Sequence, residues 1–281
     1  MMARTSICGR RRAGRALCAA LAVGILASLT LAMWPLAGRA RAQNSPGPVV
    51  AAASDLQFAL TEVADAFRTE TGGSVRLSFG SSGNFARQLR QGAPFEVFFS
   101  ADEAYVEALA RDGFLRDDGA IYAVGRLVLF VPKGSPLAAD GTLGDLRGAA
   151  TDGRLRKFAI ANPEHAPYGQ RAKEVLLHAG LWAAVESKLV LGETVSQAAQ
   201  FATTANVQGG IIAYSLALSP KVSALGSYAL IPETWHRPLR QRMALTTAAG
   251  AAAERFYAFA QSETARAIFR KHGFTLPGES G

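Results

Sequence analysis

One stretch of the chain, residues 78–88, reads SFGSSGNFARQ and contains the pattern that decides the fold. Its two adjacent serines, Ser81 and Ser82, lie between Gly80 and Gly83, after a short apolar run and before a helical pattern. A helix that begins at such a point presents unpaired N–H groups and the positive end of its dipole, and both favour an anion. The stretch therefore predicts a strand that turns into a helix beside an anion site.

The same kind of junction occurs at three other places, at Ser54, at 163–169 and at 192–195. Each follows a short apolar run and precedes a helical pattern, and none of the four turns contains Lys or Arg. Neutral donors suit a compact oxyanion that must later be released, because they satisfy its acceptors without the desolvation cost of a buried ion pair. The alternative interpretation is that Ser54 and Ser82 are ordinary N-caps of their helices.

Short apolar runs alternate with helical patterns along most of the chain. The runs, which are bounded by turn residues, are 49–53, 75–79, 96–99, 127–131, 158–161 and 210–213. The helical patterns are 56–71, 84–91, 102–112, 170–179, 196–204 and 251–271. Apolar runs of this length are typical of buried strands in a parallel or mixed sheet, so the alternation predicts an α/β fold with helices on both faces of the sheet.

The first 42 residues have the parts of a secretory signal peptide. Five arginines precede or begin an apolar stretch at 16–36, and a small-x-small cleavage motif follows at 40–42. We expect this segment to be removed on export to the periplasm, and the three arginines at 10–12 leave the twin-arginine route open. The alternative is a retained membrane anchor, since the apolar stretch is long enough to span a bilayer.

The charge and the cysteine content of the chain change once this segment is set aside. It holds seven of the 30 basic residues and none of the 22 acidic residues, so the rest of the chain carries a net charge near +1. We therefore expect no nucleic-acid partner, because the basic footprint lies in the export signal. Both cysteines, Cys8 and Cys18, also lie there, which excludes disulfides and cysteine metal sites from the mature chain.

An exported serine hydrolase that uses Ser82 is the rival class of function. Glu164 and His165 suggest acid–base chemistry, and a hydrolase needs an activated serine held beside a histidine. However, the run 80–83 does not have the G-x-S-x-G form of a nucleophile elbow. No pair of histidines or carboxylates has a spacing that suits zinc. These patterns favour a binding protein over an enzyme.

Five motifs in a fixed order carry a resemblance to a known family. They are AAAS at 51–54, FGSSGNFARQ at 79–88, GAP at 92–94 with SAD at 100–102, NPEHAPYG at 162–169 and FRKHGF at 269–274. Through them the chain resembles the periplasmic molybdate-binding proteins of ABC importers, over essentially the whole mature chain. Each motif alone is weakly specific, whereas the ordered set is strongly specific.

The resemblance implies a two-lobed α/β fold of the type II periplasmic-binding-protein kind, with a mixed sheet flanked by helices in each lobe. The first lobe would combine 46–123 with 237–281, and the second would take 124–236. The lobes would close over molybdate or tungstate, and an ABC transporter permease with its ATPase would read the closed form. We expect a monomer that is not an enzyme and has no cofactor. The alternative ligand is another tetrahedral oxyanion such as sulfate.

The resemblance also implies the ligand-binding residues. Ser54 and Ser82 would donate hydroxyl and backbone hydrogen bonds from the first lobe, and Tyr168 and Val195 would donate from the second, Val195 through its N–H. The molybdenum would be held only through its oxygens. Asp55 is a departure from the family pattern, because a carboxylate in contact with a dianion is repulsive. We expect only its N–H to face the ligand, while its side chain turns toward the first helical turn, where negative charge is favoured.

A second departure concerns the tyrosine of the site. Many relatives have alanine at the place of Tyr168 and a tyrosine at the end of the strand that corresponds to 210–213. This chain has Ala213 there, and Tyr214 follows one residue later. A shift of one residue along a strand turns a side chain to the opposite face. We therefore expect Tyr168, rather than Tyr214, to bring a phenol to the ligand.

Overall fold

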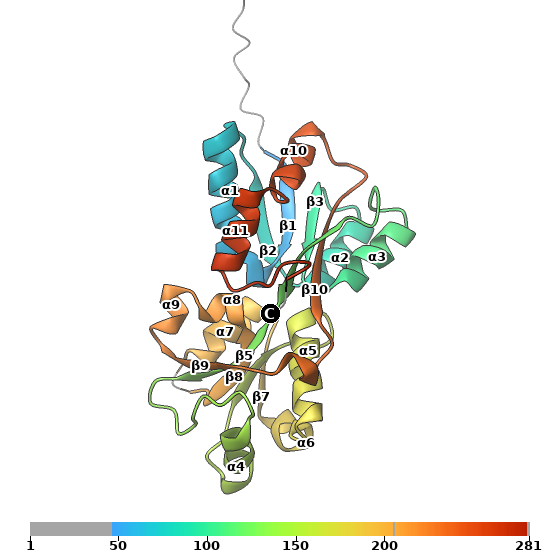
Figure 1. Cartoon of the computed structure of the whole chain (residues 1–281). Helices are drawn as coiled ribbons and strands as arrows, with labels where there is room; N and C mark the ends of the chain where they lie inside the picture. The colour runs from blue at the N-terminus through green and yellow to red at the C-terminus, as the bar shows by residue number, and fades with distance from the viewer. Residues whose placement is uncertain (1–46, 205, 280–281) are drawn as a thin grey trace, which may run out of the picture. The chain divides into compact units, whose positions relative to one another are not determined.

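The computed structural model describes residues 47–204 and 206–279 (Figure 1). The predicted signal peptide, 1–42, lies outside the described residues. Within them the strands form two five-stranded sheets, and each sheet contains both parallel and antiparallel neighbours. The predicted fold class, a two-lobed α/β fold with a mixed sheet in each lobe, is confirmed. No helix in these ranges has the length and apolar content needed to cross a membrane.

The first sheet is formed by the first four strands of the described chain together with β10, a strand from near its C-terminal end. Its strands are β1 (Val49–Ala53), β2 (Arg76–Gly80), β3 (Val97–Ser100), β4 (Ala120–Gly125) and β10 (Leu239–Leu245). Their order is β2-β1-β3-β10-β4. β1 is parallel to β2 and β3, whereas β10 is antiparallel to β3 and β4. The carboxyl ends of β1 and β2 therefore lie at one edge of the sheet, where the serine-containing junctions follow them.

Helices cover both faces of this sheet (Figure 1). They are α1 (Gln57–Thr71), α2 (Ser82–Arg90), α3 (Glu103–Arg111), α10 (Ala251–Phe259) and α11 (Glu263–Lys271). Successive side chains of a strand point to opposite faces, so Val50 and Ala52 pack with α1, α10 and α11, whereas Ala51 packs with α2 and α3. A strand buried on both faces has no polar positions, which is why β1 reads as the unbroken apolar run VVAAA.

The second sheet is formed by the middle of the chain. Its strands are β5 (Leu127–Pro132), β6 (Phe158–Ala161), β7 (Leu189–Gly192), β8 (Gly209–Ala213) and β9 (Gly226–Leu230), in the order β7-β6-β8-β5-β9. Its helices are α4 (Gly144–Asp152), α5 (Pro167–His178), α6 (Trp182–Val185), α7 (Val195–Ala202), α8 (Tyr214–Ala217) and α9 (Pro220–Ser223). The parallel strands β6 and β7 end at one edge, directly before α5 and α7.

Several helix bounds differ from the prediction. Three helices begin earlier, α2 at Ser82, α5 at Pro167 and α7 at Val195. Ser81 accepts the hydrogen bond that caps α2, and a proline at the first position has its φ angle preset for a helix. The last predicted helix is two helices, α10 and α11, because Ser262 caps a new one. Ser82, Tyr168 and Val195 were expected in loops before their helices. They lie instead in the first turns of α2, α5 and α7, where N–H groups have no acceptor within the helix.

The chain crosses between the two sheets twice. It leaves the first sheet at Gly125, enters the second at Leu127, and returns between β9 and β10 through a short 3₁₀ helix, Glu233–Trp235. The predicted lobe boundary between residues 123 and 124 falls inside β4. The predicted division of the chain into lobes stays a prediction at this point.

Candidate functional site

The structure brings all five predicted ligand-binding residues to the lining of one pocket. Ser54 and Asp55 follow β1, Ser82 begins α2, Tyr168 lies in the first turn of α5, and Val195 begins α7. Each of the five has at most 4% of its surface exposed. Because these elements extend from both sheets, the pocket lies between the two lobes. The strand-to-helix junctions that the sequence singled out therefore meet in space.

The first turn of α2 leaves one N–H group free. The N–H of Gly83 donates to the carbonyl of His165 at 3.0 Å, and the N–H of Asn84 donates to Ser81 Oγ at 3.3 Å. First-turn N–H groups have no acceptor within their own helix. The N–H of Ser82 has no acceptor elsewhere among the described residues either. It is therefore available to a ligand in the pocket.

The first turns of α5 and α7 leave free N–H groups in the same way. In α7 the N–H of Ser196 donates to Ser54 Oγ at 3.3 Å, and the N–H of Gln197 donates to the N-cap side chain at 3.1 Å. The N–H of Val195 remains without an acceptor in the described ranges. The helix α5 begins with a proline, which has no N–H, and the N–H of Tyr168 also remains free there. Three helix N-termini thus bring one free N–H group each to the pocket lining.

Ser54 and Ser82 add two hydroxyl donors. Ser82 Oγ accepts a hydrogen bond from the N–H of Ala101 at 3.0 Å, and Ser54 Oγ accepts from the N–H of Ser196. Neither hydroxyl hydrogen has an acceptor within the part of the chain that the structure describes, so both are free to donate. The interpretation of these serines as N-caps is wrong, because Ser81 caps α2 and Ala53 precedes the turn that contains Ser54.

The side chain of Asp55 accepts two hydrogen bonds inside the site. The hydroxyl of Tyr168 donates to Asp55 Oδ2 at 3.0 Å, and Gln241 Nε2 donates to the same oxygen at 2.6 Å. Gln241 is held in this orientation because its Oε1 accepts from the hydroxyl of Tyr122 at 2.7 Å. The prediction that the Asp55 side chain turns toward its own helical turn is wrong, since donors from α5 and β10 hold it instead.

Burial sets the ionisation of this group of side chains. It raises the pKa of Asp55 to about 6, and the hydrogen bonds from Gln241 and Tyr168 oppose only part of that rise. Burial also raises the pKa values of Tyr122 and Tyr168 well above the ordinary value, so both phenols stay protonated at neutral pH. Asp55 Oδ1 is buried and has no hydrogen-bond partner among the described residues. One carboxyl oxygen of the site is therefore unsatisfied.

Sequence reasoning did not find Gln241 and Tyr122. Both are buried, Gln241 completely, and together they position the carboxyl group of Asp55. A signal was present in β10, where Leu239, Gln241 and Met243 alternate with two arginines, so that a lone amide occupies an inward-facing position between apolar residues. A buried glutamine requires hydrogen-bond partners, and in this protein those partners are residues of the pocket.

Tyr214 lies outside the pocket lining. It begins α8, and its ring packs edge-on against Tyr228 with the ring centroids 5.8 Å apart. The guanidinium carbon of Arg126 lies 5.4 Å from the centroid of the Tyr214 ring. Tyr168, the tyrosine that was expected at the ligand, lines the pocket, and its phenol donates to Asp55 in the described form.

Asp55 is the only charged residue among the described residues that line the pocket, and no cationic side chain lines it. A buried ion pair between Arg171 of α5 and Asp102, which caps α3, joins the two lobes outside this lining. Within the pocket, an anion would meet N–H and O–H groups together with one carboxyl group. The absence of a compensating cation makes the ionisation of that carboxyl group important for binding.

Among the described residues no histidine contacts Ser82, the serine of the hydrolase alternative, although a histidine and a carboxylate do lie in contact beside the neighbouring Ser81. His165 Nδ1 lies 2.9 Å from Ser81 Oγ, and its Nε2 lies 3.2 Å from a carboxylate oxygen of Glu193. Ser82 Oγ contacts the N–H of Ala101 instead of a histidine. The same residues contain no group of three or more His, Cys, Asp or Glu side chains that could hold a metal ion.

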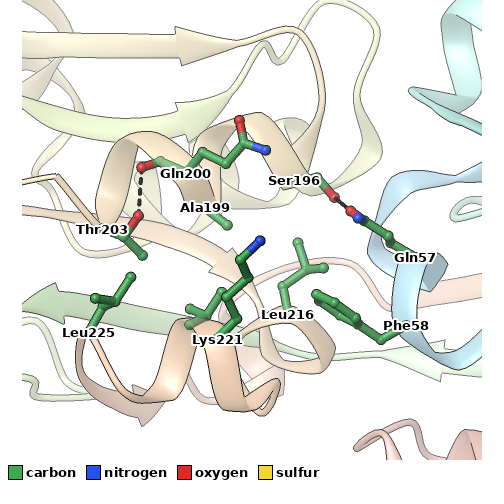
Figure 2. Close-up of a pocket in the computed structure, with 10 residues that line it drawn as sticks. Gln57, Phe58, Ser196, Ala199, Gln200, Thr203, Leu216, Lys221 and Leu225 are labelled. Carbon is green, nitrogen blue, oxygen red and sulfur yellow. Dashed lines mark hydrogen bonds between the residues drawn. The ribbon is translucent and has the colours of Figure 1, made fainter.

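A second pocket opens beside α7, α8 and α9, and Figure 2 shows its lining. Its volume is about 190 Å³, whereas the pocket of the five predicted residues encloses about 10 Å³, which is room for about one water molecule. Phe58 and Leu216 give it an apolar lining, Lys221 is its charged residue, and Ser196 Oγ lies 3.3 Å from Gln57 Oε1. It lacks the converging free N–H groups that a small dianion requires.

The fold and the site define the class of this protein. The family model of the bacterial extracellular solute-binding proteins matches residues 48–275, and the chain belongs to this family.

Relatives within this class include proteins that are named for an oxyanion. Over 232 residues the chain is 37% identical to the molybdate-binding protein ModA of Rhodobacter capsulatus. This match covers 81% of this chain and 88% of that protein. It is 33% identical to ModA of Azotobacter vinelandii, over 81% of this chain and 89% of the relative. The solved structure of the periplasmic molybdate-binding protein of Azotobacter vinelandii is similar, with a TM-score of 0.72 and 31% identity over 82% of this chain and 99% of that one.

Proposed function

We propose that this protein captures molybdate, and tungstate comparably, in the periplasm and delivers it to the membrane permease of an ABC transporter. The main support is the convergence of three free helix N–H groups and two free serine hydroxyls on one buried pocket without a cation. These donors suit a tetrahedral dianion, since every oxygen of such an ion accepts hydrogen bonds. The relatives named for molybdate favour this anion over sulfate.

In this proposal four of the five residues donate hydrogen bonds directly to the anion. Ser54 and Ser82 donate their hydroxyl hydrogens, while Ser82, Tyr168 and Val195 donate their N–H groups. The molybdenum is held only through its oxygens. The Tyr168 phenol acts through Asp55, to which it donates, instead of donating directly to the ligand.

Capture of the anion requires the lobes to move apart and close again. A pocket of about 10 Å³ is too small for a tetrahedral oxyanion, so the anion enters a more open form. Ser196 Oγ donates to the carbonyl of Ser54 at 2.8 Å, and Gly83 donates to the carbonyl of His165, so the described form has its lobes in contact. We assign 46–123 with 237–281 to one lobe and 124–236 to the other, except that Val124 and Gly125 stay with β4 in the first lobe, and the permease would recognise their closed arrangement.

Titration calorimetry with molybdate, tungstate, sulfate and phosphate tests this proposal. We expect molybdate and tungstate to bind with one site per chain, and sulfate and phosphate to bind far more weakly, because the relatives that match most of this chain are named for molybdate. A preference for sulfate would change the assigned ligand. Absence of binding by all four anions would overturn the proposal, and ester hydrolysis that Ser82→Ala abolishes would favour the hydrolase.

The cellular part of the proposal has a separate test. We expect the chain to be exported and cleaved, so that the N-terminal sequence of the protein recovered from the periplasm begins at Gln43. We also expect it to be a monomer by light scattering, with and without molybdate. A protein that stays in the membrane fraction with residues 1–42 attached would support the membrane-anchor alternative.

A further inference from the structure

We propose that Asp55 binds the oxyanion as a neutral carboxyl group, so that the closed site takes up one proton with each dianion. The inference rests on the proposed function and deepens it. It adds a donor that the serines and the helix N–H groups do not supply, and it makes capture of the anion depend on pH.

The hydrogen bonds around Asp55 decide which oxygen would carry the proton. Oδ2 accepts from the hydroxyl of Tyr168 at 3.0 Å and from Gln241 Nε2 at 2.6 Å. Gln241 cannot turn its amide over without losing the bond that its Oε1 accepts from Tyr122. Oδ2 is therefore held as an acceptor. Oδ1 is buried, belongs to a residue of the pocket lining, and has no partner within the described ranges, so the proton belongs on Oδ1.

The surroundings of Asp55 offer no positive charge that would keep it ionised beside a dianion. The groups that face it are Tyr122 on β4, Tyr168 on α5 and Gln241 on β10, all uncharged, while Ser215 of α8 donates to its backbone carbonyl at 2.9 Å. None of the ion pairs formed by the described residues includes Asp55.

The charged groups elsewhere around the pocket are paired with one another. Arg171 pairs with Asp102, and His165 lies between Ser81 and Glu193. His165 is the histidine among these groups, so it needs a control in any pH experiment. An ionised Asp55 would face the anion as a like charge, whereas a protonated Asp55 would donate a hydrogen bond to it.

Linkage gives the direction of the pH effect. Burial raises the pKa of Asp55 to about 6 in the described form, whose lobes are in contact without a ligand, and a neighbouring dianion raises it further because like charges disfavour ionisation. In a more open form Asp55 is less buried, so its pKa there is lower and closure with the anion still takes up a proton. Binding takes up a proton wherever the solution pH lies between these two pKa values. The affinity should then fall by about tenfold for each pH unit above about pH 6. At lower pH both states are protonated, and the affinity should become independent of pH.

Calorimetric titration of the full chain with molybdate, in buffers of different ionisation enthalpy near pH 7.5, counts the protons directly. We expect close to one proton taken up per molybdate bound by the wild type. In Asp55→Asn the amide oxygen can keep the two donors and the NH₂ group can replace the Oδ1–H donor. This variant should take up almost no proton, show a flat pH profile, and bind at least tenfold more tightly than the wild type near pH 8.

The control variant is His165→Gln, which should still take up close to one proton. If Asp55→Asn does not fold, the proton counts of the wild type and of His165→Gln decide the proposal. Molybdate binding with no proton uptake would overturn this inference and leave the proposed function standing. Uptake that persists in Asp55→Asn, or disappears in His165→Gln, would assign the proton to another group and overturn the role of Asp55. Absence of molybdate binding by the wild type would overturn both proposals.

Discussion

Replacing Gly83 with alanine should weaken molybdate binding without unfolding the protein. Gly83 is the second residue of α2, and its N–H donates to the carbonyl of His165, in the loop that precedes α5 in the other lobe. A Cβ atom on Gly83 would lie 2.6 Å from that carbonyl oxygen and 3.0 Å from the hydroxyl of Tyr105. The carbonyl belongs to the backbone and cannot turn aside as a flexible side chain can. The two lobes would therefore have to stay further apart.

The magnitude follows from two effects that fall only on the closed form. Loss of the hydrogen bond costs about 1 kcal/mol, and the overpacked contact costs about 1–3 kcal/mol. Together they should raise the Kd for molybdate by roughly 30-fold to 1,000-fold. The helix α2 itself should gain about 0.5–1 kcal/mol, because alanine is a better helix residue than glycine. The thermal midpoint of the unliganded protein should therefore not fall.

The assay is titration calorimetry, combined with X-ray scattering with and without molybdate. The matched control is Gly148→Ala in α4, whose Cβ would have the flexible Arg154 side chain as its neighbour at 3.3 Å. The control should bind and compact like the wild type, whereas Gly83→Ala should keep the unliganded scattering profile at molybdate concentrations that saturate the wild type. Wild-type affinity and compaction in Gly83→Ala would refute the reasoning that the lobes close at this contact.

Three further substitutions test the pocket and the ion pair between the lobes. Ser82→Ala should raise the molybdate Kd by about 10-fold to 150-fold. The control variant Ser135→Ala, outside the pocket lining, should keep the wild-type Kd. Equal Kd values for the two variants would remove Ser82 from the site. Arg171→Met should lower the free energy of unfolding in urea by about 3–5 kcal/mol, because it leaves Asp102 buried without its partner. Asp55→Asn should stabilise the unliganded protein by up to about 3 kcal/mol at pH 7.5, as measured by urea unfolding.

The sign of this last effect follows from the two pKa values of Asp55. The folded value is about 6 and the ordinary value is 3.8. The folded state binds the proton more tightly, so the stability that the neutral carboxyl contributes is fully present below about pH 4 and is lost as the pH rises through 6. The gain from Asp55→Asn should therefore disappear near pH 4. A gain that is the same at pH 4 and pH 7.5 would show that the carboxyl group is not titrating in the folded protein.

Local pattern was enough to predict an α/β fold, whereas its two lobes were predicted from the family resemblance. Strands that are buried on both faces contain no polar alternation, so β1, β3 and β6 appear as short apolar runs between turn residues. Local pattern was not enough for β10, which was missed as a strand. Its arginines face outward, and its partners β3 and β4 lie more than a hundred positions earlier in the chain. Pairing over such a separation leaves no mark within a short window of sequence.

The candidate site, like the fold, could be predicted from the sequence only in part. The sequence pattern and the family resemblance placed Ser54, Ser82, Tyr168 and Val195 at strand-to-helix junctions, where first-turn N–H groups have no acceptor within their own helix. They could not show that Ser81, instead of Ser82, caps α2. The difference matters, because Ser82 is then the first residue of α2, and its own N–H has no acceptor among the described residues.

By itself, then, the sequence determined the alternation of strands and helices, the small hydroxylated turns between them, and hence the kind of ligand those turns suit. Only the tertiary structure decided where the carboxyl group of Asp55 points and which of its oxygens is unsatisfied. Its partners Tyr168 and Gln241 stand 113 and 186 positions further along the chain. Backbone donors are a property of local conformation, whereas the partners of a buried side chain depend on how distant segments pack.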